Sequence, residues 1–463
     1  MTLPGTRAPR LVSLGPLIVL AAAAVAPACH REQDTRAMNV LLVSVDTLRD
    51  DHCSVSGYAR ETTPTLETLA RQGTRMELAY APTATTGPTH ASLLTSLYPI
   101  AHGVVKNGLP LTAEHHTLAE TLSAGGYRTA AVVSSFVLHA KFGYGQGFEV
   151  YEDDFDPASA TLSRSQFQGV PIDSAFDQPA NRTTETAIRL LAQLGKGEEP
   201  FLLFVHYFDP HAPYVPPEPF ASRFAAEPFR DAGLAVAISA YDGEIAFADH
   251  EVGKLLEFLE TSGLDRNTLV VVTADHGEGL MQHGHMNHGV YVYEEAVRVP
   301  LLFRLPGRIE AGRNLAGPVE LVDVMPTVLE LAGVEPPEGQ QGRSLAAALQ
   351  GGAPLDPERA VFLHRRHYEP RQVGNISVAG EKFAVRVGPW KYIEGEEEGT
   401  RELFNLEDDP GELVNLYESS RTVADELRAR IAAWKSDYAR ETGDRPKPSP
   451  EDLERLRALG YVE

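Results

Sequence analysis

The chain has 463 residues, of which 43% are hydrophobic and 23% charged, and its formal net charge is −23 at pH 7. This length suggests two to four domains, although large α/β folds often run as one unit with a smaller appendage. The apolar share is that of an ordinary globular protein and allows a sizeable core. Such an acidic chain lacks the Lys/Arg excess that displaces counterions from nucleic acid, so we expect no nucleic-acid groove. An anionic substrate must therefore be held by local devices such as a metal ion, histidines and helix N-termini.

Residues 1–29 have the pattern of an export signal. Two arginines are followed by an apolar stretch, residues 11–25, which is too short for a convincing membrane span, and then by Ala26, Pro27 and Ala28. Cys29 follows directly, which leaves two alternatives open: a lipoprotein anchored to the membrane through a lipidated Cys29, or a freely secreted protein. Either alternative predicts an exported protein of the periplasm or cell envelope. With only two cysteines in the chain, no disulfide framework is expected.

Two apolar, β-branched runs end in acidic residues. Residues 39–46 (NVLLVSVD) end at Asp46, and residues 268–278 (TLVVVTADHGE) carry Asp275 where the apolar run stops. Buried parallel strands have this composition, and their carboxyl ends form sites at one edge of the sheet. We therefore expect both acids at the same sheet edge.

Between these runs, residues 86–99 (TGPTHASLLTSLYP) predict a helix whose start faces that edge. Pro88 suits the first helical position, which makes Gly87 the predicted N-cap and puts Thr86 just outside the helix. Free N–H groups and the helix dipole favour an anion at such a start, so a phosphate or sulfate ester would bind against the Thr86 hydroxyl. An ordinary capped helix has the same local pattern.

Asp46, Asp275, His276 and the Thr86 oxygen together offer three hard oxygen ligands and one imidazole. This set suits a divalent metal ion, either Mn²⁺, Mg²⁺, Ca²⁺ or Zn²⁺, and does not choose among them. A bound cation would also make the hydroxyl easier to deprotonate.

Further histidines follow the other predicted elements. Residues 201–207 (FLLFVHY) predict a strand that leads to His211, which we expect to contact the site. In the loop HGHMNHG we favour His288 first and His283 second as site residues, although a loop histidine is often only solvated. The long helix predicted over residues 240–260 should carry Asp249 and His250 on its solvated face.

Gly, Gln and Pro accumulate over residues 339–357 and suggest a boundary there. The catalytic domain would then span residues 37–345, and short alternating runs followed by a helix would form an antiparallel sheet plus helix over residues 358–440. The tail, residues 441–463, should end in a helix that lies back on the body.

The order of VDTLR, TGPTHASLLTSLYPIAHG, DPHAPY, TADHGE and YEEAVRVPL resembles the sulfatase family of the alkaline phosphatase superfamily. The resemblance implies an α/β fold, a three-layer sandwich with a smaller C-terminal α+β domain, and metal-dependent cleavage of sulfate or phosphate esters. Sulfatases carry a Cys or Ser, converted to formylglycine, in a C/S-x-P-S/A-R pattern. The matching residues here are Thr86, Pro88, Thr89 and His90, and threonine cannot yield that aldehyde.

The same stretch, continued through His102, Gly103 and Asn107, resembles the Thr-nucleophile motif of nucleotide pyrophosphatase/phosphodiesterases. This second resemblance implies that Thr86 is the nucleophile. Asn107 and His90 become candidate contacts to the non-bridging oxygens of an ester. Two histidines, His211 and His288, become candidate acid/base groups or ligands of a second metal. The Lys and His that touch sulfate in many sulfatases are absent, because the matching run is VSSF at residues 133–136.

These observations predict an exported, metal-dependent hydrolase of anionic esters, with phosphodiester or phosphomonoester hydrolysis or transfer favoured by the threonine. The alternative is a catalytically inactive sulfatase-like binding protein, which the missing aldehyde precursor and sulfate contacts would permit. Metal binding distinguishes the hydrolase from the inactive protein. A relative that lost its activity is not expected to keep all of the predicted metal ligands. The leaving group, the metal and the oligomeric state stay open at this point.

Overall fold

The computed structural model describes residues 1–2, 5, 37–155, 166–167, 170–171, 176–224, 231–438 and 448–458. The chain divides into two units, Met1–Thr35 and Arg36–Glu463, and the fold described below belongs to the second. Cys29 and nearly all of the predicted export signal lie outside the described residues. Of the helices in the described ranges, none is both long enough and apolar enough to cross a membrane.

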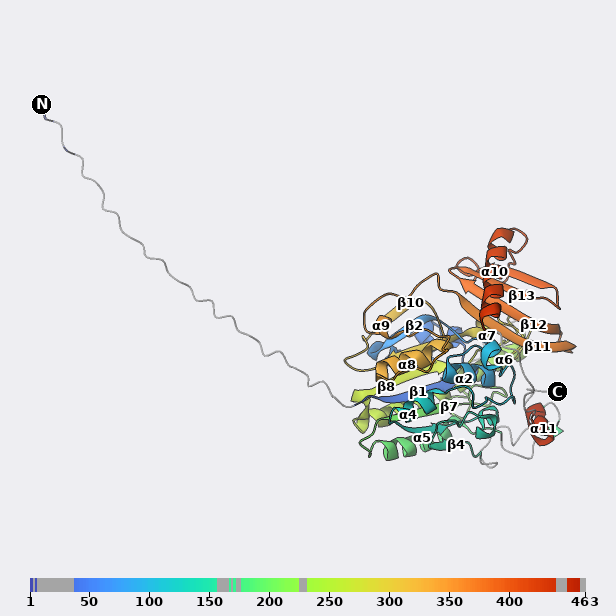
Figure 1. Ribbon diagram of the computed structural model, residues 1–463, viewed down its shortest axis with the longest axis horizontal. Helices are drawn as coiled ribbons and strands as arrows, with labels where there is room; N and C mark the ends of the chain where they lie inside the picture. Colours follow the sequence, from blue (N-terminus) through green and yellow to red (C-terminus); the bar gives the residue numbers. More distant parts are fainter. Residues whose placement is uncertain are drawn as a thin grey trace. The chain divides into compact units, whose positions relative to one another are not determined.

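An eight-stranded sheet with the order β10-β2-β9-β8-β1-β7-β3-β4 forms the centre of the fold (Figure 1). Strand β1 (Asn39–Val45) lies between β8 (Thr268–Ala274) and β7 (Phe201–Tyr207) and is parallel to both. Only β9 runs against its two neighbours in this sheet. The other strands are β2 (Thr74–Tyr80), β3 (Arg128–Val132), β4 (Val150–Glu152), β9 (Arg298–Arg304) and β10 (Arg313–Glu320).

Two groups of helices pack on the sheet and make the domain three-layered. The first group is α1 (Pro64–Gln72), α5 (Ala180–Leu194) and α6 (Ala232–Thr261), and the second is α2 (Thr86–Thr95), α4 (Leu118–Ala124) and α8 (Val324–Ala332). Burial on both faces explains why strands β1, β7 and β8 are continuous apolar runs rather than alternating ones. Shorter elements are α3 (Pro99–His102), α7 (Glu294–Val297), α9 (Ala346–Leu349), β5 (Gln166–Phe167), β6 (Val170–Pro171), η1 (Asp50–His52), η2 (Ser54–Ser56), η3 (Phe136–Leu138), η4 (Ala140–Phe142), η6 (Leu264–Asn267) and η7 (Leu321–Asp323).

The C-terminal part contains a four-stranded antiparallel sheet, β11-β12-β13-β14, with helix α10 (Arg421–Tyr438) packed on it. Its strands are β11 (Val361–Val373), β12 (Ile376–Val387), β13 (Trp390–Gly395) and β14 (Thr400–Asn405). Phe383, Tyr392, Leu427, Ile431 and Trp434 belong to the core between the sheet and the helix. The predicted fold class is therefore confirmed.

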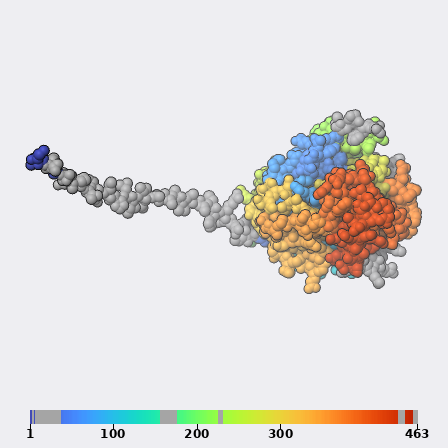
Figure 2. Space-filling model, turned by 90° about the horizontal axis from the view of Figure 1, so that it is seen from above, coloured from blue at the N-terminus to red at the C-terminus, as the bar shows by residue number. Residues whose placement is uncertain are grey.

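The two sheets are in direct contact. In Figure 2 the orange and red C-terminal residues form one continuous surface with the yellow residues that precede them. Arg359 reaches across to Asp323 at the end of η7 with an ion pair of 2.5 Å. The domain boundaries at residues 345 and 358 stay predictions.

The start of α2 differs from the prediction by two residues. The helix begins at Thr86 with Thr85 as N-cap, so the predicted N-cap at Gly87 is wrong. Pro88 is then the third helical residue, and this position also tolerates proline because first-turn N–H groups have no partner inside the helix. Thr86 therefore belongs to the first turn rather than preceding it.

Asp249 also differs from the prediction, because it was expected on the solvated face of its helix and is buried instead. Its carboxylate is buried and accepts hydrogen bonds from the N–H groups of Thr65 (2.9 Å) and Leu66 (3.1 Å), at the start of α1. An acid of α6 thus caps another helix, which no pattern within α6 could reveal. His250, the next residue, is exposed as predicted.

Candidate active site

Asp46, Thr86, Asp275 and His276 come together at the carboxyl ends of β1 and β8. Val45 pairs with Ala274 in the parallel register, so the acids that follow each strand lie at the same level. The Thr86 Oγ1 lies 3.2 Å from His276 Nε2 and 3.5 Å from Asp46 Oδ2. His276 Nε2 lies 3.5 Å from Asp275 Oδ2 and 3.8 Å from Asp46 Oδ1. All four side chains are fully buried.

The electrostatics of this cluster fit a cation. Burial raises the pKa of Asp46, and the Asp275 carboxylate adds to that rise. Burial also opposes ionisation of Asp275, yet His276, His90 and His206 hold its pKa below the usual value. Asp46 Oδ1 and Asp275 Oδ2 have no hydrogen-bond partner among the described residues. Two buried acids with unsatisfied oxygens, beside an imidazole nitrogen and a hydroxyl, match the donor set of a divalent metal ion.

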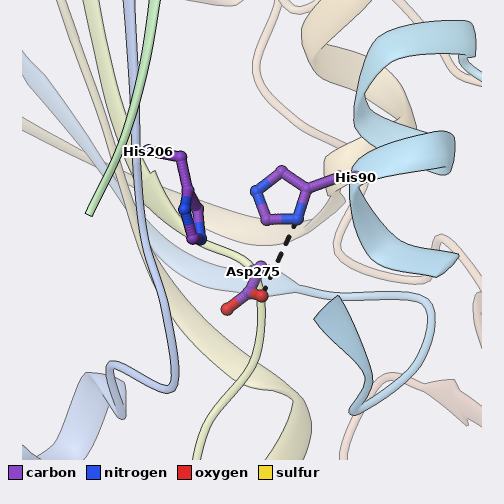
Figure 3. A group of neighbouring side chains, drawn as sticks. All are labelled: His90, His206 and Asp275. Carbon is purple, nitrogen blue, oxygen red and sulfur yellow. Dashed lines mark ion pairs between the residues drawn. The ribbon is translucent and has the colours of Figure 1, made fainter. Parts of the chain in front are cut away.

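His90 and His206 form a second group with Asp275, and Figure 3 shows these three side chains together. His206 Nε2 also lies 3.5 Å from Asp46 Oδ2. The His90 Nδ1–H donates to the Thr86 carbonyl at 2.8 Å, and the Ser44 hydroxyl is placed to donate to Nε2 at 3.0 Å. Burial lowers the pKa of His90 to about 3 and that of His206 to about 4, so both rings are neutral at pH 7. Both His90 nitrogens are thus engaged inside the protein, and its contact with a substrate oxygen stays a prediction.

Asn107 lies at the start of α2. Its Oδ1 accepts the Gly87 N–H at 2.7 Å, while its buried Nδ2 has no partner among the described residues. A Cβ placed on Gly87 would lie 2.9 Å from both Asn107 Oδ1 and the Tyr144 hydroxyl. The first turn of α2 therefore has an amide donor and a phenol hydroxyl beside it, close to Thr86.

His211 and His288 lie next to His276. The ring centroids of His276 and His288 are 4.4 Å apart, and those of His288 and His211 are 5.2 Å apart. The His211 Nδ1–H donates to the Ala212 carbonyl at 2.6 Å, which leaves Nε2 with its lone pair. Burial lowers the pKa of His211 to about 3, and His288 adds to that effect. The structure thus brings both predicted histidines to the metal-ligand side of the site.

His283 lies elsewhere. Its Nδ1 is 2.7 Å from Glu295 Oε1, its Nε2 is 3.3 Å from the Glu412 carbonyl, and its ring stacks on Tyr293 with centroids 3.8 Å apart. Burial lowers the pKa of His283, but the hydrogen bond to Glu295, the Glu295 charge and the carbonyl and charge of Glu412 together raise it above the usual value. These contacts fit a charged residue that connects its loop to the C-terminal part.

Sequence reasoning missed three residues of the site: Glu278, Tyr144 and His206. The buried Glu278 lies 3.3 Å from His288 Nδ1 and accepts from the Tyr214 hydroxyl at 3.2 Å. Its position three residues after Asp275 was a usable signal. His206 was recognisable only as a polar residue in an apolar strand, and nothing local marks Tyr144, because its loop meets Gly87 only in the folded protein.

Comparison with known proteins supplies the family. The model of the family described as Sulfatase matches residues 38–334, which is more than half of the chain. The chain belongs to the sulfatase family. A second model, described as N-sulphoglucosamine sulphohydrolase, C-terminal, matches residues 282–437. The protein is therefore a sulfatase-family ester hydrolase, and members of this family typically bind a divalent metal ion.

Curated relatives of this sulfatase-family protein have different activities in their names. A multifunctional alkaline phosphatase superfamily protein of Trinickia caryophylli is 26% identical, over 90% of this chain and 98% of the relative. An N-acetylglucosamine-6-O-sulfatase of Bacteroides thetaiotaomicron is 24% identical, over 87% of this chain and 86% of the relative. The family is thus common to them, while the substrate is not.

Solved structures agree with the fold. The phosphonate monoester hydrolase of Agrobacterium radiobacter has a TM-score of 0.73 at 23% identity, covering 87% of this chain and 96% of that chain. The phosphonate monoester hydrolase of Silicibacter pomeroyi has a TM-score of 0.71 at 23% identity, with the same coverage. These similarities show the three-layer fold with its C-terminal sheet and do not assign a substrate.

Proposed function

We propose that this protein is a metal-dependent hydrolase of phosphoric esters, both monoesters and diesters, with Thr86 as the nucleophile. The observation that carries the proposal is the Thr86 hydroxyl, which lies 3.2 Å from His276 Nε2 where sulfatases have their aldehyde precursor. A threonine hydroxyl can attack phosphorus directly and needs no prior modification.

Asp46, Asp275, His276 and the Thr86 hydroxyl would hold the cation, and the two unsatisfied carboxylate oxygens support this assignment. When bound, the cation supplies positive charge that lowers the pKa of a hydroxyl and neutralises the anionic ester. The sequence alternatives for its identity, Ca²⁺, Mn²⁺, Mg²⁺ and Zn²⁺, are variables of the experiment below.

The protein's own residues would carry two displacements. In the first, Thr86 Oγ1 loses its proton and forms a bond to phosphorus, while the bond from phosphorus to the leaving alcohol oxygen breaks and that oxygen takes up a proton. In the second, a water oxygen loses a proton and forms a bond to phosphorus, while the bond from phosphorus to Thr86 Oγ1 breaks and Oγ1 takes up a proton, which releases phosphate or a phosphate monoester. His211 suits the role of base for the water, because its Nδ1–H is held by the Ala212 carbonyl and its Nε2 is unprotonated. His288, beside Glu278, is the other candidate for proton transfer.

Binding of the non-bridging oxygens would fall to the start of α2. Asn107 Nδ2 is a buried donor without a partner among the described residues, and the Tyr144 hydroxyl lies beside the same glycine. The helix dipole and the first-turn N–H groups favour an anion at this place. The names of two relatives, a multifunctional alkaline phosphatase superfamily protein and a phosphonate monoester hydrolase, support phosphorus chemistry as well.

A substrate panel tests the proposal. Purified protein is assayed with an aryl sulfate, a phosphate monoester, a phosphodiester and a phosphonate monoester, each with Ca²⁺, Mn²⁺, Mg²⁺ and Zn²⁺. We expect kcat/KM to be highest for a phosphoric ester. A preference for the aryl sulfate would contradict the proposal. Absence of turnover together with absence of bound metal would establish the rival, a catalytically inactive binding protein.

We also propose that the protein acts outside the cytoplasm, in the periplasm or cell envelope. The support is the basic, apolar and small-residue pattern of residues 1–29 and the cysteine that follows it. Mass spectrometry of the mature N-terminus distinguishes a lipidated Cys29 from a freely secreted chain. An unprocessed Met1 on protein isolated from its native cells would contradict export.

A further inference from the structure

The last described helix, α11 (Pro450–Ala458), is fixed to the catalytic part of the chain. Leu456 is fully buried, and a Cβ placed on Gly108 would lie only 2.2 Å from its Cδ1. Gly108 has a φ of +81°, so its backbone also favours glycine. Leu456 thus occupies the space that a side chain at position 108 would need. Figure 1 draws α11 well apart from α10, the helix of the C-terminal sheet.

Charged groups fix α11 to a second segment. Asp452 forms an ion pair with Lys141 of η4. The Lys141 ammonium lies 4.2 Å from the centroid of the Phe136 ring, and the Arg455 guanidinium lies 5.4 Å from the same centroid. The Ser449 hydroxyl accepts the Asp452 N–H at 3.1 Å and so caps the helix. Helix α11 therefore spans two loops of the catalytic part, one at Gly108 and one over residues 136–142.

Asn107 and Tyr144, the two side chains beside Gly87, directly adjoin these two loops. Asn107 directly precedes Gly108, and Tyr144 lies two residues beyond Phe142. The loops also hold each other, because the Leu111 N–H donates to the Phe142 carbonyl at 2.9 Å. Any shift of α11 would thus move the backbone next to both side chains.

We propose that α11 is a strap that positions Asn107 and Tyr144 for binding the non-bridging oxygens of the ester. Leu456 is its main positioning residue, and the pair of Asp452 with Lys141 fixes its orientation. This inference rests on the proposed function, since it concerns the same anion site. It adds that the C-terminal tail, far from Thr86 in sequence, sets the affinity for the anionic group.

The first test is Leu456→Ala in the full-length chain. We expect the Kd for inorganic phosphate, measured by titration calorimetry on the metal-loaded protein, and the KM for the best phosphoric ester to rise about five- to tenfold. The kcat should stay within about twofold, because the groups that react are untouched. Leu456→Met, which nearly keeps the volume, should restore both values.

Leu427→Ala is the matched control. Leu427 is a buried leucine of α10 in the C-terminal core, whereas Leu456 belongs to the main core, so truncation of Leu427 creates a similar cavity in a different core cluster. It should lower the melting temperature while leaving the Kd for phosphate unchanged. An equal rise of the Kd in both variants would overturn the positioning role, because general loosening would then explain the effect.

A charge-exchange cycle tests the strap without creating a cavity. Lys141→Asp places a carboxylate opposite Asp452 and should raise the Kd for phosphate, and adding Asp452→Lys should bring it back toward the wild-type value. Additive effects without rescue would contradict the strap. If the wild-type protein binds phosphate and neither Leu456→Ala nor Lys141→Asp changes the Kd, the inference alone is wrong. If the wild-type protein neither binds phosphate nor hydrolyses a phosphoric ester, the proposed function itself fails.

Discussion

Two pairs of buried acids in this protein have opposite surroundings. At the sheet junction, Glu320 and Asp323 face Arg359, whose guanidinium nitrogens lie 2.5 and 2.7 Å from the two Asp323 oxygens and 3.1 Å from Glu320 Oε2. In the active site, the side chains that face Asp46 and Asp275 are histidines and the Thr86 hydroxyl, and Asp275 Oδ1 also accepts the N–H groups of Thr47 and His276. Each of the two acids keeps one oxygen without a partner among the described residues. All four acids are buried, so the two pairs differ in the hydrogen-bond donors that surround them.

The junction pair is also satisfied by neutral donors. The Tyr98 hydroxyl donates to Glu320 at 2.9 Å, the Phe362 N–H donates to Glu320 at 3.0 Å, and the Arg343 N–H donates to Asp323 at 2.7 Å. A buried acid with every oxygen satisfied holds two elements together. A buried carboxylate with an unsatisfied oxygen has a free-energy cost that a bound cation or a proton can offset. Of these two pairs, the satisfied one at the junction joins two elements, and the unsatisfied one in the active site is the one expected to bind a ligand.

The largest effect should come from removal of the Thr86 hydroxyl, which lies beside Asp46 and Asp275. Thr86→Ala should lower kcat at least about 10⁴-fold with the fold intact, and Thr86→Ser should keep part of the activity because the oxygen remains. Steady-state kinetics and a thermal melt measure the two properties. Mass spectrometry of the wild-type peptide should show plain threonine at position 86.

Thr327 is the matched control at the junction, where its buried hydroxyl donates to the Asp323 carbonyl at 2.6 Å. Thr327→Ala should lower stability by about 1–2 kcal/mol and leave kcat unchanged. Wild-type turnover by Thr86→Ala would exclude the proposed mechanism whatever the family.

The next largest effect should follow Arg359→Ala. It leaves Glu320 and Asp323 buried without their cation, which costs about 3–5 kcal/mol of unfolding free energy. Urea unfolding measures the loss. Arg128→Ala is the control, because the side chains of Arg128 and Glu149 are 45% and 40% exposed and such a pair contributes about 0–1 kcal/mol. Equal losses for the two arginines would show that the junction acids do not depend on Arg359.

Metal removal should affect the surroundings of Asp46 and Asp275 and leave those of Glu320 and Asp323 unchanged. A cation present at about 100 times its Kd stabilises the folded protein by about 2.7 kcal/mol, so chelation should lower the melting temperature. Asp46→Asn removes one charge of the pair, and its melting temperature should not respond to the chelator. Elemental analysis of wild-type protein provides the metal content. Identical wild-type melts with and without chelator, together with no metal, would remove the catalytic interpretation.

The smallest effect concerns Asp249, the buried acid that caps α1. Burial raises its pKa to about 7, against hydrogen bonds from the Thr65 and Leu66 N–H groups and the charge of Arg223. In the unfolded chain an aspartate has a pKa of about 3.9. Between about pH 4 and pH 7 the folded protein therefore binds more protons than the unfolded chain, so this group makes stability fall as the pH rises through that window.

Asp249→Asn keeps an oxygen that accepts hydrogen bonds and should remove this part of the slope, at most about 1.4 kcal/mol per pH unit. Urea unfolding at about pH 5 and about pH 7 measures it. Glu257→Gln, at an exposed position of the same helix, should leave the slope unchanged. A slope that persists in Asp249→Asn would show that the capping carboxylate is already ionised at about pH 5.

Much of the catalytic framework was readable in the sequence. The runs at residues 39–46, 201–207 and 268–278 predicted three of the central strands, because strands buried on both faces must be continuously apolar. Polar side chains that directly follow parallel strands lie at the same edge of the sheet. For this reason the sequence predicted that Asp46, Asp275 and Thr86 lie close together.

Tertiary structure alone decided the rest. Asp249 of α6 caps α1, His283 binds residues of α7 and the C-terminal part, and Tyr144 meets Gly87 across a loop. Helix α11 reaches back from the tail to Gly108 in the same way. Each of these contacts joins segments far apart in the chain, whereas hydrophobic periodicity, caps and turns report only on neighbours within a few residues. The sequence by itself determined which side chains could perform the chemistry and which strands would deliver them. Packing decided which distant side chains satisfy, orient or leave unsatisfied the buried polar groups around them.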